Sequence, residues 1–300
     1  MIFRRLCIFI VVIILFLSAG TLFSGEQVFK PFIMGSNFSG NMTIVKSEVI
    51  NKLENQGFEI IGEYSPYTDA YVIIITNNIL KNIAAGSEHG GFGAMQRVSL
   101  TKINNSIQVS YTNPTYMFYA YRMKGNIESI SSSLEQALGV QNKFGSDKGL
   151  SEKKLSKYQY KVLMPRFNNV ITIAKYKSYN EAIIAVESGL AAGNGGTSKV
   201  YRIDIPGKEE TVFGVALTTM DNAGSDFTVM EEIDFKSIRS TAHLPYEILV
   251  TGKKVIIFDG KFRIAINFPD LSMMGDHSFM NIVGAPGDIE KSLKAAALGK

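Results

Sequence analysis

The chain contains three histidines, and each of them stands in a motif that could bind a ligand or move a proton. The first motif reads Glu88-His89-Gly90-Gly91-Phe92-Gly93. Its glycines permit unusual backbone angles and a close approach of the backbone to a ligand. It lacks the strand–GxGxxG–helix setting and the lysine of nucleotide sites. The motif therefore predicts either a loop that contacts a ligand or a mobile surface loop.

The second motif contains His243, which is followed by Pro245 and by Glu247 at the start of an expected strand. If both side chains point into a cleft, His243 and Glu247 form an acid–base pair, as in a hydrolase or an isomerase. The alternative is a structural histidine that is hydrogen-bonded to a backbone carbonyl. Because the chain has no GxSxG, HExxH or DxDxDG motif, a protein that is not an enzyme is favoured.

The third motif combines soft sulfur with imidazole, in the residues Met273, Met274, His277 and Met280. These are ligands for Cu(I) or for haem iron. The alternative is ordinary core packing, since 12 methionines are spread along the chain. No CxxCH motif is present, which excludes covalent c-type haem. We predict no cofactor and keep copper or haem handling as the alternative.

A second glycine-rich segment lies between an expected helix and an expected strand. It reads Gly193-Asn194-Gly195-Gly196-Thr197. Successive backbone amides at Gly195 and Gly196 could form an anion-binding nest. A simple change of chain direction is the alternative.

The composition excludes several classes of protein. A hydrophobic content of 46% in 300 residues is ample for a core, and it argues against disorder. A net charge of +4 without a long basic run gives no reason to expect a nucleic-acid partner. A single cysteine cannot form an intramolecular disulfide or a cysteine zinc site.

The N-terminus has the pattern of an export signal. Arg4 and Arg5 precede an apolar run over 6–17, and small residues follow at 18–20. Residues 1–25 are therefore interpreted as a signal peptide, with an uncleaved membrane anchor as the alternative. We expect a periplasmic or extracellular protein that meets a membrane only if this segment is retained.

The remaining chain shows the same order of expected elements twice, namely helix, two strands, hairpin and helix. The first series is a helix at 44–58, strands at 59–63 and 71–76, a hairpin at 97–114 and a helix at 127–139. The second is a helix at 176–190, strands at 199–205 and 211–218, a hairpin around Asp259-Gly260 at 254–270 and a helix at 289–299. This order predicts an α+β fold of two related lobes, each an antiparallel sheet with helices on one face. The lobes are expected at 26–145 and 166–300, with a solvated, lysine-rich linker at 146–165.

Part of the first lobe also carries a family resemblance. Its opening helix ends in Gln56-Gly57-Phe58, and its late strand at 107–111 runs into Asn113-Pro114. On these residues, the segment 40–125 resembles a widespread bacterial family known as domain-of-unknown-function family 302, from which it departs by an insertion around 84–94. The resemblance implies a small α+β fold that associates in pairs, and it implies no activity and no catalytic residues. A duplicated chain would hold two such units as a pseudo-dimer.

The sequence therefore predicts an exported protein that binds a small ligand or an envelope protein partner between two duplicated lobes. The Glu88–Gly93 and Gly195-Gly196 loops, His243 and Glu247 are its candidate ligand-binding residues.

Overall fold

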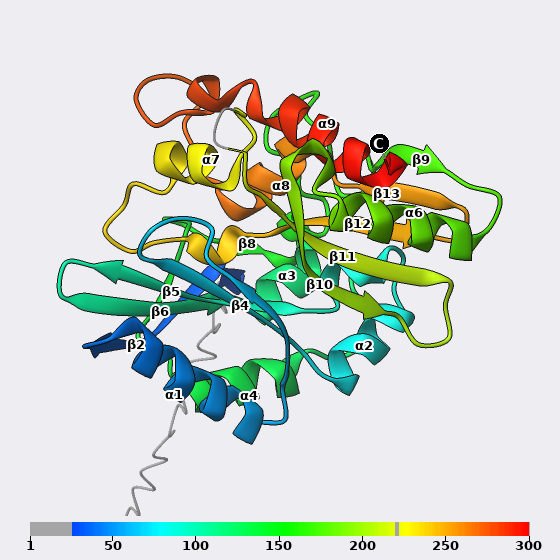
Figure 1. The fold of residues 1–300 in the computed structure, drawn as a ribbon. Helices are drawn as coiled ribbons and strands as arrows, with labels where there is room; N and C mark the ends of the chain where they lie inside the picture. The colour runs from blue at the N-terminus through cyan, green and yellow to red at the C-terminus, as the bar shows by residue number, and fades with distance from the viewer. Residues whose placement is uncertain (1–25, 220–221, 300) are drawn as a thin grey trace, which may run out of the picture.

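The computed structural model describes residues 26–219 and 222–299, and the expected signal segment lies outside this range. The α+β class predicted from the sequence is confirmed (Figure 1). Two antiparallel sheets make up most of the fold, and a short two-stranded pairing joins β1 (Val28–Phe29) to β8 (Leu150–Ser151). Among the described helices, none is both long enough and apolar enough to cross a membrane.

The first half, residues 26–145, is built on a six-stranded sheet with the order β3-β4-β5-β6-β2-β7. Its strands are β2 (Phe32–Ser39), β3 (Glu59–Tyr64), β4 (Ala70–Thr76), β5 (Gln96–Ile103), β6 (Ser106–Thr112) and β7 (Asn142–Phe144). Its helices are α1 (Met42–Asn55), α2 (Asn78–Ala85), the short η1 (Gly90–Gly93), α3 (Pro114–Ala120) and α4 (Glu128–Leu138).

The second half, residues 166–300, is built on a five-stranded sheet with the order β10-β11-β12-β13-β9. Its strands are β9 (Ile171–Lys175), β10 (Thr197–Asp204), β11 (Glu210–Leu217), β12 (Tyr246–Thr251) and β13 (Lys254–Ile257). Its helices are α6 (Tyr179–Ala191), η2 (Asn194–Gly196), α7 (Asp226–Ile233), η3 (Thr241–His243), α8 (Gly260–Asn267), η4 (Phe279–Ile282) and α9 (Ala285–Leu298).

Apart from β7, the two sheets have the same strand order relative to the chain. In the first half, β2 pairs with β6, the last strand of the meander β3-β4-β5-β6, and α1 follows β2. In the second half, β9 pairs with β13, the last strand of the meander β10-β11-β12-β13, and α6 follows β9. The last helix of each half packs beside this early helix, α4 against α1 and α9 against α6. In Figure 1, α1 and α4 lie on one side of the molecule and α6 and α9 on the opposite side.

Local sequence signals explain most of these elements. The side chain of Asn41 accepts a hydrogen bond from the Thr43 amide and caps α1, whose residues Val45, Val49 and Leu53 form one buried stripe. Ser178 caps α6 in the same way, by accepting from the Glu181 amide. The predicted helices at 44–58, 127–139, 176–190 and 289–299 are confirmed as α1, α4, α6 and α9. The predicted hairpin at 97–114 is confirmed as β5 and β6.

The hairpin predicted at 254–270 is wrong. Residues from Gly260 onward form α8, and the Asp259 side chain caps this helix by accepting from the Lys261 amide. Asp-Gly suits a tight turn, but Asp is also a preferred N-cap, and here the helix forms. The hairpin of the second half is β12–β13, which turns at Gly252 and Lys253.

The two halves pack through reciprocal contacts. The short helix η1 of the first half lies against β11 and β12, and η3 of the second half lies against β4, β5 and β6. Residues of both halves share one hydrophobic core, in which Phe92 stacks on Phe258 with 3.9 Å between ring centroids.

The segment 146–165, which was expected to be a solvated linker, is partly packed against this core. It forms β8 and the short helix α5 (Glu152–Leu155), and it buries Leu155 and Tyr158.

Candidate ligand site between the two halves

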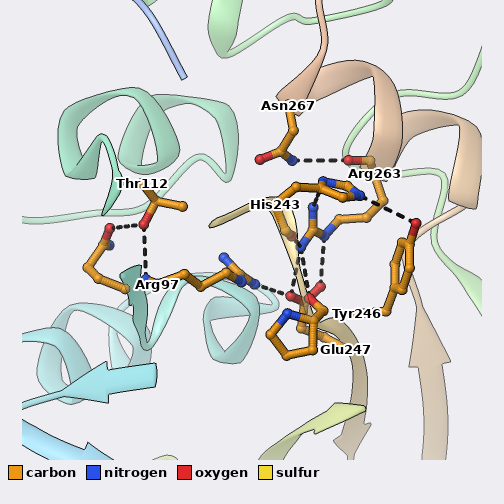
Figure 2. A network of polar contacts seen from close by, with 9 residues as sticks. Arg97, Thr112, His243, Tyr246, Glu247, Arg263 and Asn267 are labelled. Atoms are coloured by element: carbon orange, nitrogen blue, oxygen red, sulfur yellow. Dashed lines mark hydrogen bonds and ion pairs between the residues drawn. The ribbon is translucent and has the colours of Figure 1, made fainter. Parts of the chain in front are cut away.

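A buried charged network joins the halves near the middle of the molecule (Figure 2). The carboxylate of Glu247 on β12 lies between the guanidinium groups of Arg97 on β5 and Arg263 on α8. Arg263 donates from Nε to one carboxylate oxygen at 2.9 Å and from Nη2 to the other at 3.1 Å, and Arg97 Nη2 contacts the latter oxygen. The exposed fraction of each of these three residues is at most 3%. The network therefore places two positive charges and one negative charge away from water.

His243 belongs to this network. Its Nδ1 lies 2.9 Å from Nη1 of Arg263, and its Nε2 lies 3.3 Å from the Tyr246 hydroxyl. Because a guanidinium can only donate, Nδ1 must accept, and the ring proton is on Nε2. Burial, together with the charges of Arg263 and Arg97, holds the pKa of His243 well below its usual range. His243 is therefore neutral.

The structure brings His243 and Glu247 together, but through Arg263 rather than as a direct pair. A general base must reach the proton that it removes from a substrate. Both side chains are buried and are fully engaged with arginine, an arrangement that suits a structural connection between the halves.

Of the buried polar atoms that form no hydrogen bond within the described protein, four belong to this region: Arg97 Nε, the hydroxyls of Tyr121 and Tyr201, and Asn267 Oδ1. The charges of Glu247, Arg97 and Arg263 influence the pKa of both tyrosines, which places these hydroxyls near the network. A buried polar atom without a hydrogen bond lowers the stability of the folded protein. The polar groups around the charged network are therefore not explained by stability alone.

The first glycine loop meets an internal carboxylate. Gly91 lies in η1, and its amide donates to Oε1 of Glu210 on β11 at 2.7 Å. Burial raises the pKa of Glu210, although the Gly91 hydrogen bond opposes this shift. A Cβ at Gly91 would lie 2.4 Å from Leu249 Cδ1, and one at Gly90 would lie 2.0 Å from the Ala84 oxygen. Close packing between the halves therefore requires glycine at position 91, and close packing against α2 of the same half requires glycine at position 90.

The other residues of this motif lie at the edge of the same contact. Glu88 is exposed, and His89 is partly buried with a left-handed φ of 50°. A Cβ at Gly93 would lie 2.8 Å from the Met123 sulfur.

The second glycine loop packs within its own half. A Cβ at Gly195 would lie 2.6 Å from the Ser292 oxygen of α9, and one at Gly196 would overlap the Thr219 hydroxyl. Both residues have φ near +69°, which favours glycine. Because this loop contacts α9 and the first loop contacts β11, the two loops do not converge on one site.

The methionine–histidine segment lies at the surface of the second half. The His277 ring stacks on Phe235 at 4.2 Å, and its Nδ1 lies 2.8 Å from the Glu232 carbonyl oxygen. Met274 and Met280 are exposed, whereas Met273 packs against the core of the second half. No group of three or more His, Cys, Asp or Glu residues that could hold a metal ion occurs within 26–219 and 222–299.

An open cleft of about 350 Å³ lies between the halves, and we name it the interlobe cleft. The first half lines it with Tyr67, Thr68, Asp69, Thr101, Lys102 and Ile103, and the second half with Phe227, Met230, Glu231, Asp234 and Arg239. Hydroxyl groups connect the halves beside it. Thr241 Oγ1 of η3 lies 2.9 Å from the Tyr67 hydroxyl and 2.8 Å from Thr101 Oγ1.

Asp234 is the most unusual group of the interlobe cleft. Its Oδ1 accepts from the Ser240 amide at 2.7 Å, whereas its buried Oδ2 has no hydrogen-bond partner in the described protein. Burial raises the pKa of Asp234 to about 7, and the Ser240 hydrogen bond and the Arg239 charge oppose this shift only in part. The cleft thus offers a carboxyl group that can accept or donate a hydrogen bond near neutral pH.

A second buried carboxyl group, that of Asp226 at the start of α7, also has a raised pKa. Asp226 Oδ2 accepts from the Tyr64 hydroxyl of the first half at 3.0 Å, and burial raises its pKa to about 7. Both groups are expected to titrate near their usual pKa of about 4 in the unfolded chain. Protonation of each carboxyl group therefore favours the folded protein. This contribution to the free energy of unfolding is complete below pH about 4, and it is lost as the pH rises to about 7.

We therefore expect the denaturant midpoint of the wild type to fall between pH 5 and pH 8. In Asp226→Asn the fall is smaller, because one of the two groups can no longer ionise. Glu54→Gln, at an exposed position of α1, is the control, and its fall equals that of the wild type. Equal falls in Asp226→Asn and the wild type would contradict the raised pKa.

Sequence reasoning found Glu247 and His243 but missed Arg97, Arg263, Asp226 and Asp234. A signal exists for Arg263, because it interrupts the apolar residues that α8 buries, whereas Arg97 stands in β5 next to Gln96, where a polar residue is ordinary. Asp234 gives no such signal, since it follows α7 at a position where a polar residue is ordinary.

Comparison of the chain with protein-family models, with curated proteins and with solved structures finds no match in any of the three cases.

Proposed function

We propose that the chain is an exported binding protein without catalytic activity, which holds a small polar ligand in the interlobe cleft. The observation that carries this proposal is the cleft itself, which both halves line and to which Asp234, a residue with an unpaired buried Oδ2, contributes. Ligand sites typically combine a concave surface with a few convergent polar groups. Tyr67, Lys102 and Arg239 supply such groups beside Asp234. In the alternative form of this proposal, the ligand is a protein partner that inserts a polar side chain into the interlobe cleft.

We also propose that the two halves are copies of one ancestral unit. Their shared strand order and their reciprocal η1 and η3 contacts support this interpretation. The register supports it too. Asn113 and Asp259 cap the helix that follows the last strand of each hairpin. When the strand registers are continued, the residue before Asn113 lies opposite Arg97 in the β5–β6 pairing, and the residue before Asp259 lies opposite Glu247 in the β12–β13 pairing. Arg97 and Glu247 therefore occupy equivalent positions. In this interpretation the chain is a pseudo-dimer of units that resemble family 302.

The two equivalent junctions of this pseudo-dimer differ in a way that favours a single ligand site. At η1, the Glu210 carboxylate binds the Gly91 amide, and Lys208 donates to the Ser87 carbonyl oxygen at 2.5 Å. At η3, the Thr241 hydroxyl contacts and the Gln108 side-chain amide connect the halves without an ion pair among them, and the interlobe cleft lies beside them. One junction is closed by internal charges, and the other leaves room for a ligand.

Native mass spectrometry of the full chain, purified from the cells that produce it, tests the binding proposal. We expect a bound small molecule that is released on denaturation. Thr68→Trp fills the interlobe cleft from an exposed position and abolishes this mass, whereas Thr43→Trp, at an exposed position of α1, retains it. Ligand-free protein in every preparation, or a bound mass that survives Thr68→Trp, would overturn the proposal.

A further inference from the structure

A larger cleft, of about 850 Å³, lies where the segment 146–165 folds against the second half. We name it the basic cleft, because five cationic side chains line it: Lys148, Lys153, Lys154, Lys157 and Arg166. Three acidic residues, Glu26, Asp147 and Asp270, line it as well. Asp270 is already engaged, since it accepts hydrogen bonds from the Ser146 hydroxyl at 3.3 Å and from the Asp147 amide at 2.5 Å. The cleft therefore carries an excess of positive charge.

The cations of the basic cleft are also not engaged in ion pairs with described residues. Within the part of the chain that the structure describes, none of the five forms an ion pair. Elsewhere on the surface, Lys46, Lys52, Lys81 and Lys199 each pair with a glutamate. Lysines left together without partners attract an external anion more strongly than paired ones do.

An apolar tip projects beside the basic cleft. Val162 and Leu163 are 86% and 95% exposed, the highest values among the large hydrophobic residues of the described chain. Their loop connects Tyr160 to Arg166, both of which line the cleft. Two fully exposed aliphatic side chains next to unpaired lysines match the chemistry of a membrane interface, where apolar groups enter the acyl boundary and cations meet the headgroups.

The N-terminal segment joins the fold at the same place. Glu26 lines the basic cleft, and eight residues, 18–25, separate it from the apolar run at 6–17. If that segment is retained in a bilayer, residues 18–25 can span at most about 30 Å, which keeps the basic cleft within that distance of the membrane-embedded run. Stable attachment of a protein to a membrane commonly combines one apolar anchor with a polybasic patch.

We propose that the basic cleft and the Val162–Leu163 tip bind the surface of a bilayer that contains anionic phospholipids. A soluble anion would account for the lysines, but it would leave the exposed aliphatic pair without a role. This surface is separate from the interlobe cleft, so the proposal does not depend on the proposed ligand site.

The test uses the full chain with a fluorophore at the apolar tip. Cys7 is the only cysteine, so Cys7→Ser with Leu163→Cys allows an environment-sensitive dye to be attached at one position. We expect a blue shift and a several-fold increase in emission with vesicles of phosphatidylcholine and phosphatidylglycerol, and no change with phosphatidylcholine alone. A dye attached through Ile184→Cys, an exposed position on α6, stays in water with both vesicles.

Charge reversal separates the basic cleft from the N-terminal segment, which is present in every variant. Lys153→Glu/Lys154→Glu on α5 abolishes the change at position 163, whereas Lys291→Glu/Lys294→Glu on α9 leaves it intact. All four lysines are exposed, and an unchanged melting temperature confirms that each variant folds. An equal change with both vesicles, a change that survives reversal on α5, or vesicle binding without a blue shift would overturn the proposal.

Discussion

Replacing Glu247 by glutamine is expected to lower the free energy of unfolding by about 3–5 kcal/mol, the range for removing one partner from a buried ion pair. The variant keeps the size of the side chain and removes only its charge. Arg97 and Arg263 then remain buried on either side without a counter-charge. Neither can become neutral, because the guanidinium group stays protonated in proteins. Chemical denaturation followed by circular dichroism measures the effect.

Two further variants determine whether the loss comes from the buried charges. Glu54→Gln, at an exposed position of α1, is expected to change stability by less than about 0.5 kcal/mol. Arg97→Met/Glu247→Leu/Arg263→Met replaces the whole triad by apolar residues and is expected to recover most of the loss. If Glu247→Gln and Glu54→Gln lost equally little, the network would not hold the halves together.

The proposed duplication gives this triad a physical explanation. In a symmetric pair of identical units, residues at the equivalent positions of Arg97 and Glu247 would be the same. A direct contact between them would then bring like charges together, which is unfavourable. Joining the units in one chain removes this restriction, so that an arginine can face a glutamate. The same freedom allows one junction to close around Glu210 while the other keeps a cleft beside Asp234.

The elements that the sequence predicted correctly are those set by local chemistry. The caps Asn41 and Ser178, and the two strands around Asn104-Asn105, depend on neighbours within a few residues. The Asp259-Gly260 prediction failed because the same dipeptide suits a turn and a helix start. The choice between them depends on α8 packing, for example on the Arg263 contacts with Glu247.

The site was harder to predict, because its partners are distant in the sequence. Arg97 and Glu247 are separated by 150 positions, and no local pattern brings them together. The lysines at 153, 154 and 157 were expected to face solvent as part of a linker. Their neighbours Leu155 and Tyr158 are buried, and Tyr158 donates to the Ala265 carbonyl oxygen at 2.8 Å. These anchors fix the lysines around one cleft, an arrangement that composition alone does not indicate.

Replacing Gly189 by alanine is expected to destabilise the protein by about 1–3 kcal/mol, the usual range for overpacking. The sign is opposite to that expected inside a helix, where alanine is better than glycine by about 1 kcal/mol. The reason is the close approach of α6 and α9. A Cβ at Gly189 would lie 1.9 Å from the Ala296 backbone oxygen, so one helix must move away from the other. The melting temperature and the denaturant midpoint both measure the loss.

Gly287→Ala is the matched control, because Gly287 lies in α9 itself and a Cβ there would have no neighbour within 4 Å. Helix propensity then acts alone, and we expect a gain of at most about 1 kcal/mol. Opposite signs for the two substitutions would show that direct contact between α6 and α9 secures the helical face of the second half. If Gly189→Ala stabilised the protein as Gly287→Ala does, the two helices would be able to separate without loss, and this close contact would not contribute to stability.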